Sequence, residues 1–175
     1  MESDKSKNIR DWYDEYNEPI FKFIFMMIQD YQQAEDLRHE TFIRAFVNYE
    51  SFKHQSSPKT WLYSIAHNVT VDFIRKRKPL IMLKEVLLLK KDGGLLPSEQ
   101  IEIKESSLEL FRALATLKDT YRKVIILRKV KGFSIQETAI ILDWSESKVK
   151  STLFRAIQAL EKKMLKEDLL NEKTV

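Results

Sequence analysis

Residues 134–160 read SIQETAIILDWSESKVKSTLFRAIQAL, and this segment does more than any other to specify the structure. Apolar residues at helical spacing predict two helices, a short one over about 135–142 and a longer one behind it. Ser134, followed three residues later by Glu137, is the pattern of a capping box at the start of the first helix. Residues 143–145 interrupt the pattern and predict a tight turn. Ser145, the last of the three, can cap the second helix.

The second helix has an apolar stripe and an opposite face that is polar and basic. The stripe consists of Val149, Leu153, Ala156, Ile157, Leu160 and Met164, and the opposite face consists of Ser147, Lys148, Ser151, Phe154, Arg155 and Gln158, with Lys150 at its edge. Two amphipathic helices joined by a tight turn are typical of a helix-turn-helix that reads the major groove of DNA. A solvated helical hairpin would have the same period, but the outward Phe154 and the scarcity of acid after Glu146 favour DNA binding.

Composition favours an all-α fold, because 43% of the 175 residues are hydrophobic and the chain has only 3 glycines and 4 prolines. The absence of cysteine excludes disulfides and cysteine-based metal sites. His39, His54 and His67 are too dispersed to form a ligand set, so we expect no metal and no cofactor. The polar start of the chain and the lack of an apolar run of about 18 residues predict a cytoplasmic protein without membrane insertion.

Acidic and basic residues are segregated along the chain. Residues 1–40 carry a net charge of −5, residues 41–91 carry +7 and residues 92–175 carry +2. An acidic front followed by a basic middle suggests two kinds of partner, one a protein and one a polyanion.

The acidic front is predicted to contain two helices behind a frayed segment, residues 1–10. The helical stripe of the first begins at Trp12, and Pro19 lies inside it, so the helix either starts near Pro19 or kinks there. The second is capped by Asp30, with its core side formed by Ala34, Leu37, Thr41, Phe42, Ala45 and Phe46 and its outer side by Glu35, Asp36, Arg38, His39, Glu40 and Arg44. Periodicity alone leaves open whether this outer side serves solubility or docks a basic partner.

The basic middle is predicted to be a loop over residues 47–60 and a helix capped by Thr60 and ended by Pro79. The inner stripe of this helix is Leu62, Ile65, Ala66, Val69 and Phe73, and the outer face is Ser64, His67, Asn68, Val71 and Arg75, flanked by Trp61 and Tyr63. The basic run 75–78 is often only compensation of the helix dipole. Basic groups interleaved with aromatics also suit single-stranded nucleic acid, where bases stack and phosphates pair.

The rest of the chain divides at a connector. Residues 79–103 contain the breaks Gly93-Gly94 and Pro97-Ser98, and the apolar residues near 80–87 are compatible with a short amphipathic helix. A helix from about Ile103 and a buried helix over 121–130 then lead to a turn at Gly132. The tail after about Glu167 is predicted to fray. We therefore expect two small helical domains, residues 10–78 and 104–168, joined by the linker 79–103.

Two blocks, in this order, resemble the bacterial extracytoplasmic-function (ECF) RNA polymerase sigma factors. AEDLRHETFIRAF with SFKHQSSPKTWLYSIAHNVTVDFIRKRK (residues 34–46 and 51–78) is similar to region 2 of that family. LATLKDTYRKVIILRKVKGFSIQETAIILDWSESKVKSTLFRAIQAL (residues 114–160) is similar to region 4. The order of the blocks, the spacing between them and the total length all fit the small sigma factors of this group.

The resemblance implies roles for three sets of residues. Contact with core RNA polymerase is implied for Glu35, Asp36, Leu37, Glu40, Thr41 and Phe42. Opening of the minus-ten promoter element and capture of a base from the melted nontemplate strand are implied for Lys53, His54, Ser56, Lys59, Thr60, Trp61, Asn68 and Arg75. Duplex contact at the minus-thirty-five element is implied for Ser147, Lys148, Lys150, Ser151, Phe154 and Arg155. An anti-sigma protein is a further partner that the resemblance implies.

The chain departs from the family pattern at several positions. Asp143 stands in the hairpin turn where Gly or Asn is usual, and aspartate tolerates the left-handed conformation. Thr152 replaces a common arginine, which removes one phosphate contact. The connector is more apolar and basic than the acidic linker typical of the group.

Two other function classes are alternatives to a sigma factor. A stand-alone helix-turn-helix regulator would bind duplex DNA without joining polymerase, and it would need neither an acidic docking helix nor a single-strand reader. An enzyme would need a paired-carboxylate metal site, a Ser/His/Asp set or a phosphate-cradling glycine loop, and none of these patterns occurs. The sequence therefore predicts a promoter-specificity subunit without catalysis of its own.

Overall fold

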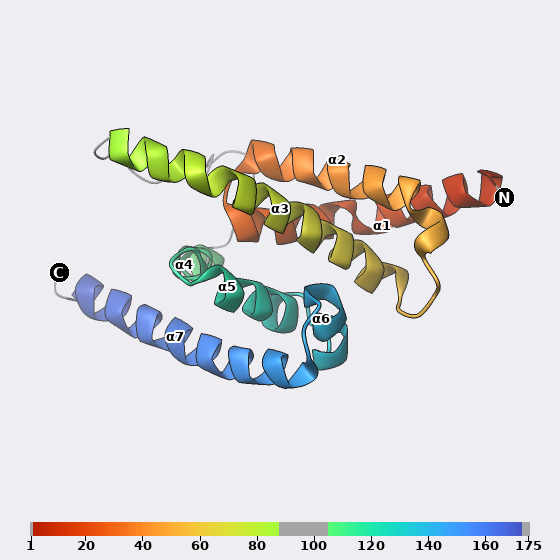
Figure 1. Cartoon of the computed structure of the whole chain (residues 1–175). Helices are drawn as coiled ribbons and strands as arrows, with labels where there is room; N and C mark the ends of the chain where they lie inside the picture. Colours follow the sequence, from red (N-terminus) through yellow and green to blue (C-terminus); the bar gives the residue numbers. More distant parts are fainter. Residues whose placement is uncertain (1, 88–104, 173–175) are drawn as a thin grey trace. The chain divides into compact units, whose positions relative to one another are not determined.

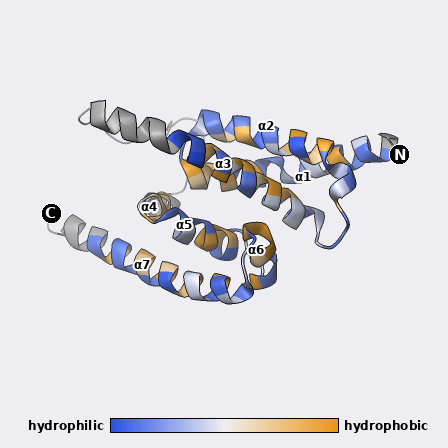
Figure 2. Cartoon of the chain, viewed as in Figure 1, coloured by the Kyte–Doolittle hydropathy of each residue, from blue (hydrophilic) through white to orange (hydrophobic). Residues whose placement is uncertain are grey.

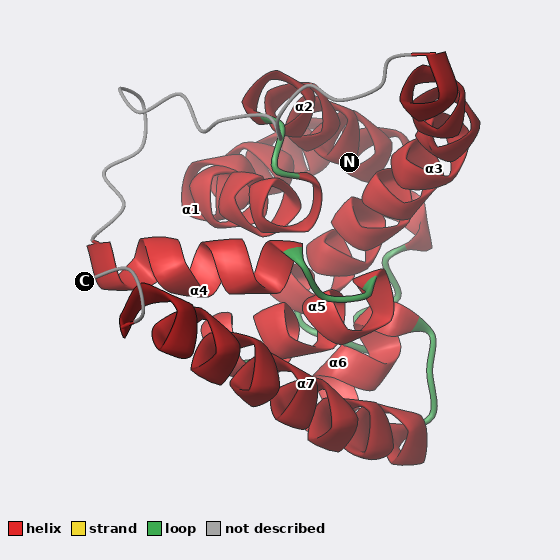
Figure 3. Ribbon diagram, turned by 90° about the vertical axis from the view of Figure 1, so that its left-hand side faces the viewer, coloured by secondary structure: helices red, strands yellow, loops and turns green. Residues whose placement is uncertain are grey.

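A computed structural model describes residues 2–87 and 105–172 of the chain (Figure 1). These residues form α-helices joined by short turns, and none of them lies in a strand (Figure 3), as the composition predicted. The helices fall into two compact units, one containing α1 to α3 and the other α4 to α7. The bounds are α1 Glu2–Ile28, α2 Tyr31–Val47, α3 Pro58–Leu87, α4 Glu105–Ala115, α5 Asp119–Ile125, α6 Ile135–Leu142 and α7 Glu146–Glu172, with a 3-10 turn at Tyr49–Ser51 and a π-helical turn at Ile126–Val130.

In the first unit, α1, α2 and α3 pack against one another around an apolar core (Figures 1 and 2). The fully or almost fully buried side chains include Ile20, Phe23, Ile24 and Met27 of α1, Ala34 and Ala45 of α2, and Leu62, Tyr63 and Ala66 of α3. The sequence places Tyr63 at the flank of the outer face, but the side chain is entirely buried, and its ring contacts that of Phe23 in a tilted arrangement with centroids 5.3 Å apart. Burial raises the pKa of the Tyr63 phenol.

The N-terminal segment does not fray, contrary to the sequence prediction, because its side chains contact the rest of the unit. The α1 helix begins at Glu2 and continues through Pro19 to Ile28. The Asn8 side-chain amide donates a 2.6 Å hydrogen bond to the Tyr49 hydroxyl. The Lys5 ammonium lies 4.5 Å from the centre of the Phe46 ring. These contacts offset the entropy cost of ordering a polar helix end.

The α3 helix begins and ends differently from the prediction. Its cap is Ser57, whose hydroxyl accepts a 3.1 Å hydrogen bond from the Thr60 amide, and not Thr60 itself. Pro58 then occupies the first helical position, where its missing N–H costs nothing. At the other end the helix passes Pro79 and continues to Leu87, because a proline inside a helix can kink it without ending it. The rest of the predicted connector, residues 88–104, lies outside the described residues.

In the second unit, α5 and α7 pack along each other and α6 lies across the end of the pair (Figure 1). The core includes Leu114, Val124, Ile126, Leu127, Ile141, Val149 and Ala156. The guanidinium of Arg122 closes the end of α4, where it donates to the carbonyls of Leu114 (2.9 Å), Ala115 (2.7 Å) and Leu117 (3.0 Å). Carbonyls at a helix end have no partner within the helix, so a buried cation is a good cap there.

The predicted helix-turn-helix is confirmed in its local detail. Gly132 has a positive φ of 73°, as a left-handed turn residue should. Ser134 and Glu137 form the capping box at the start of α6, with hydrogen bonds of 3.0 and 2.7 Å. Asp143 is left-handed, with φ 53°, and ends that helix. The Ser145 hydroxyl caps α7 by accepting from the Lys148 amide at 3.2 Å. At its far end α7 continues to Glu172 and so passes the predicted fraying point.

Candidate functional site

The outer face of α7 is exposed at every position predicted to contact duplex DNA. Val149 and Ala156 on the opposite side are fully buried, which fixes the rotation of the helix. The Phe154 ring is 66% exposed and stands among the polar and basic side chains of this face. The exposed residues of this face, named here the recognition face, are Ser147, Lys148, Lys150, Ser151, Phe154 and Arg155.

The turn before α7 carries a residue that the sequence analysis did not assign. The ring of Trp144 lies 4.3 Å from the Lys148 ammonium and 5.0 Å from the ammonium of Lys123 on α5. Burial lowers the pKa of Lys123, and the nearby charge of Lys148 lowers it further. The contact with Lys148 could have been expected from the sequence, because that lysine follows Trp144 by four residues. The contact with Lys123 could not, because it depends on the fold bringing α5 to the turn.

The predicted docking residues on α2 divide between its surface and the core. Asp36 is exposed and Glu35 and Glu40 are half-buried, so these acids face outward. In contrast, Leu37 and Phe42 are buried and Thr41 is fully buried. The Thr41 hydroxyl donates a 2.7 Å hydrogen bond to the Leu37 carbonyl of the same helix. The three buried residues therefore shape α2, and the three acids form its outer surface.

Two exposed apolar residues of α2 were missed. Ile43 is 60% exposed and Val47 is 67% exposed. Together with Asp36 and Glu40 they are spaced four, three and four residues apart, which places all four side chains on one face of the helix. This stripe of α2, acidic at one end and apolar at the other, is named here the docking stripe. The spacing was readable from the sequence, but only burial of the opposite side shows that this face is free.

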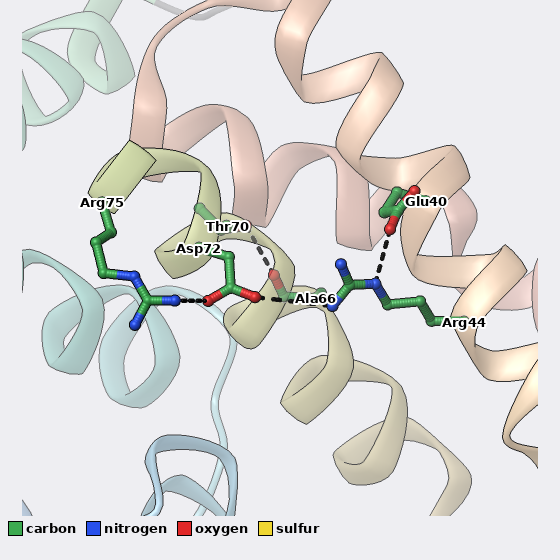
Figure 4. A network of polar contacts seen from close by, with 6 residues as sticks. All are labelled: Glu40, Arg44, Ala66, Thr70, Asp72 and Arg75. Carbon is green, nitrogen blue, oxygen red and sulfur yellow. Dashed lines mark hydrogen bonds and ion pairs between the residues drawn. The ribbon is translucent and has the colours of Figure 1, made fainter. Parts of the chain in front are cut away.

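A line of ion pairs links the docking stripe to α3 (Figure 4). The Arg44 guanidinium contacts Glu40 at 2.7 Å and, on its other side, Asp72 at 3.8 Å. Asp72 also binds Arg75 at 2.8 Å. All four side chains are partly exposed, so each pair contributes about 0–1 kcal/mol. The network connects Glu40, which was predicted to contact polymerase, with Arg75, which was predicted to contact the minus-ten element.

The basic loop before α3 rests on an aromatic cluster that sequence reasoning only partly found. Its rings come from α1, from the 3-10 turn and loop, and from α3. Trp12 lies 6.0 Å from Trp61 and 5.4 Å from Phe52, and Phe52 lies 4.4 Å from the His54 ring. Tyr49 joins the cluster at 5.7 Å from Trp12. Each such aromatic pair contributes about 0.5–1.5 kcal/mol beyond its buried area.

The predicted minus-ten residues occupy different environments. Lys53, His54, Asn68 and Arg75 are exposed, and Ser56, Lys59 and Trp61 are half-buried. Thr60 is fully buried, and its hydroxyl lies 3.0 Å from that of Ser57. His67, expected on the outer face, is also buried. The exposed residues among those predicted for the minus-ten element are therefore polar or basic, and they come from the loop and from α3.

Comparison with known proteins matches both units. Residues 12–79 match the family Sigma-70 region 2, and residues 107–160 match Sigma-70, region 4. The ECF RNA polymerase sigma factor SigX of Bacillus subtilis (strain 168) is 39% identical over 171 residues, which cover 91% of this chain and 86% of SigX. The ECF sigma factor SigM of the same organism is 35% identical and covers 85% and 90% of the two chains.

A solved structure has the same fold. The sigma factor RpoE of Bartonella quintana, crystallised with the anti-sigma factor NepR, superposes with a TM-score of 0.75 at 24% identity, covering 91% of this chain and 98% of RpoE. The fold and the exposed faces thus define an all-helical, helix-turn-helix DNA-binding protein. The comparisons specify it further: the chain belongs to the ECF RNA polymerase sigma factors.

Membership of this family gives the chain its function. A sigma factor joins core RNA polymerase and directs promoter recognition and transcription initiation, and it is a regulator that has no catalysis of its own. The matches to both regions do not favour a stand-alone regulator. Separately, none of the described helices combines the length and the apolar character that crossing a membrane requires.

Proposed function

We propose that the surfaces described above divide the work of a sigma factor, so that residues 10–78 bind core polymerase and open the minus-ten element and residues 104–168 bind the minus-thirty-five element. The linker 79–103 joins them. In this assignment the chain acts by binding alone and catalyses no reaction. The supporting observations are three separate surfaces with different chemistry, one acidic and apolar, one basic over aromatics, and one basic with an exposed phenylalanine.

The docking stripe suits a helical partner of core polymerase. Ile43 and Val47 offer apolar area, and Asp36 and Glu40 beside them select for basic side chains. Apolar contacts supply affinity in such an interface, whereas charges supply orientation and association rate. This arrangement supports contact of α2 with a coiled coil of the polymerase.

The basic loop and α3 suit a melted DNA strand. Lys53 and Lys59 provide charges for phosphates, and Asn68 offers an exposed amide for the edge of a base. Unstacking a base costs a few kcal/mol, which stacking and edge hydrogen bonds offset. We assign Thr60 a structural part in this surface, because its fully buried side chain packs beneath the loop.

One observation supports the assignment of the second unit to the minus-thirty-five element. All six residues of the recognition face of α7 are exposed, and Phe154 among them is 66% exposed. An α-helix fits the major groove, where Lys and Arg bind guanine edges and an apolar ring contacts the thymine methyl group. Each good base contact is worth about 1–3 kcal/mol of discrimination.

The test is a double substitution on this face. Lys150→Ala with Arg155→Ala should lower transcription from promoters that depend on the minus-thirty-five element by about tenfold or more, while binding to core polymerase stays intact. The matched control is Lys162→Ala with Lys163→Ala, two exposed lysines further along α7. Loss of polymerase binding in the first variant, or equal loss of transcription in both, would contradict the assignment.

An anti-sigma partner is also part of this proposal. The solved structures with the same fold include a sigma factor bound to the anti-sigma factor NepR and another, CnrH, bound to the cytosolic domain of CnrY. A protein that covers the docking stripe would exclude polymerase directly. Competition between such a protein and core polymerase for the purified chain would support this part, and simultaneous binding of both would contradict direct exclusion.

A further inference from the structure

The turn of the helix-turn-helix holds two lysines from different helices around one indole. Lys123 comes from α5 and Lys148 from the first turn of α7, and both ammonium groups lie over the ring of Trp144, which stands between the two lysines in the chain. The two ammonium groups lie 5.0 and 4.3 Å from the centre of the same ring. These distances are those of cation–π contacts, which are strongest with tryptophan.

The backbone fixes the position of this indole. Asp143 takes the left-handed conformation after α6, and two hydrogen bonds then close the helix end. The Trp144 amide donates to the Ala139 carbonyl at 2.9 Å, and the Asp143 amide donates to the Ile140 carbonyl at 3.3 Å. The backbone of Trp144 is therefore held by the Schellman motif of α6, which places the indole at the turn.

Two like charges around one ring repel each other in the free protein. Partial burial lowers the pKa of Lys123, and the charge of Lys148 lowers it further. A neighbouring carboxylate, Asp119, acts in the opposite direction on Lys123. An anion that reached both ammonium groups would remove the repulsion, and a DNA phosphate has the charge and the oxygen geometry to do so.

We propose that Lys123, Trp144 and Lys148 form a phosphate clamp, which binds a backbone phosphate of duplex DNA beside the recognition face. The clamp rests on the proposed binding of duplex DNA by α7. Lys148 belongs to that face, whereas Lys123 and Trp144 extend the contact to α5 and the turn. The clamp carries no sequence information, because phosphate contacts set register and orientation and base contacts set specificity.

The test measures binding of holoenzyme, reconstituted from core RNA polymerase and the full chain, to a promoter duplex that the wild-type holoenzyme selects from a random pool. The logarithm of the affinity falls linearly with the logarithm of the salt concentration, and each phosphate contact adds about 0.9 to the steepness of this slope. Lys123→Gln should lower that slope by about one contact, so the loss of affinity between 50 and 200 mM KCl should shrink by about 3.5-fold. Lys123→Arg should keep the wild-type slope.

The matched control removes the same charge elsewhere. Lys162→Gln, on an exposed position 14 residues beyond Lys148 and about 21 Å along the helix, should leave the slope unchanged. An unchanged slope in Lys123→Gln would overturn the clamp, as would an equal decrease in both glutamine variants.

A double-mutant cycle separates positioning by Trp144 from a simple packing role. Trp144→Leu should weaken duplex binding in the wild-type background, and Trp144→Phe, which keeps a ring, should weaken it less. Once both lysines are glutamine, Trp144→Leu should have no further effect on affinity. An effect of equal size in both backgrounds would show a packing role and overturn the clamp.

Failure of the clamp is distinguishable from failure of the proposed function. If the wild-type chain joins core polymerase and binds the duplex, but Lys123→Gln has the same salt slope as Lys123→Arg and the wild type, only the clamp is overturned. If the wild-type holoenzyme does not bind duplex DNA through α7, the proposed function of the second unit fails and the clamp fails with it.

Discussion

At the scale of single residues, the interfaces depend on side chains held in place by buried or capped neighbours. Asn68 is exposed on α3 although the residues on either side of it, His67 and Val69, are buried, and its amide has the donors and acceptors to read a base edge. Arg122 has a structural role instead, because its hydrogen bonds cap the end of α4 within the second unit.

We expect Asn68→Ala to slow promoter opening on duplex templates by about tenfold, and to matter less on templates melted beforehand around the minus-ten element. The physical reason is that capture of an unstacked base offsets the cost of opening, which a melted template does not require. Stopped-flow measurement of opening with both templates tests this. Gln32→Ala, which removes an exposed amide from α2, is the control. Equal slowing on both templates would point to a packing role for Asn68.

Arg122→Met should destabilise the second unit by about 2–4 kcal/mol. Its guanidinium serves three carbonyls. A hydrogen bond to a charged group contributes about 1.5–3 kcal/mol net, and bonds that share one guanidinium do not add in full. Amide hydrogen exchange of peptides from α5 to α7 in the full chain measures the loss of protection. Arg112→Met, at an exposed position of α4, should change protection by less than about 0.5 kcal/mol. Wild-type protection in the Arg122 variant would exclude this capping role.

At the scale of elements, the helices differ in how much of their structure the sequence encodes locally. The hairpin of α6 and α7 was predictable in detail because its start, turn and second cap each have a local signature, at Ser134, Asp143 and Ser145. The start of α1 was not predictable, because the contacts of Lys5 and Asn8 that order it involve Phe46 and Tyr49, about 40 residues away. Single prolines were also poor guides to where α3 ends.

The same distinction applies to the interfaces. The recognition face followed from helical periodicity, since α7 is buried on one side only and exposed on the other. The docking stripe was found only in part, because the acids were visible in the sequence but exposure of Ile43 and Val47 depends on tertiary packing. The aromatic cluster and the position of Lys123 beside Trp144 unite distant segments, and no local pattern encodes such contacts.

The docking stripe gives a prediction for α2 as an element. Asp36→Arg should block association with core polymerase, and Ile43→Ser should weaken it by about tenfold through loss of apolar contact. Neither change should alter folding, because both side chains are exposed. Co-elution of each variant with core polymerase measures the effect. Asp14→Arg, a charge reversal on an exposed part of α1, is the control, and normal association of Asp36→Arg would exclude the stripe as the docking surface.

At the scale of the whole molecule, two helical units with distinct surfaces belong to one chain. The acidic and apolar stripe of α2, the basic loop before α3 and the recognition face of α7 would be superfluous together in a protein that only bound duplex DNA. In the function proposed above each surface has its own partner, and promoter recognition requires all of them on the same polymerase. The net charge of −5 in the first 40 residues and +7 in the next 51 is consistent with this division.

The most direct test of this account is co-elution of the purified chain with core RNA polymerase, followed by run-off transcription from a library of randomised promoters. We predict a stable complex and transcripts that start only from promoters with two separate sequence elements, one near minus thirty-five and one near minus ten. Binding of the chain to duplex DNA without any association with polymerase would contradict the account and leave the surfaces of the first unit without a function.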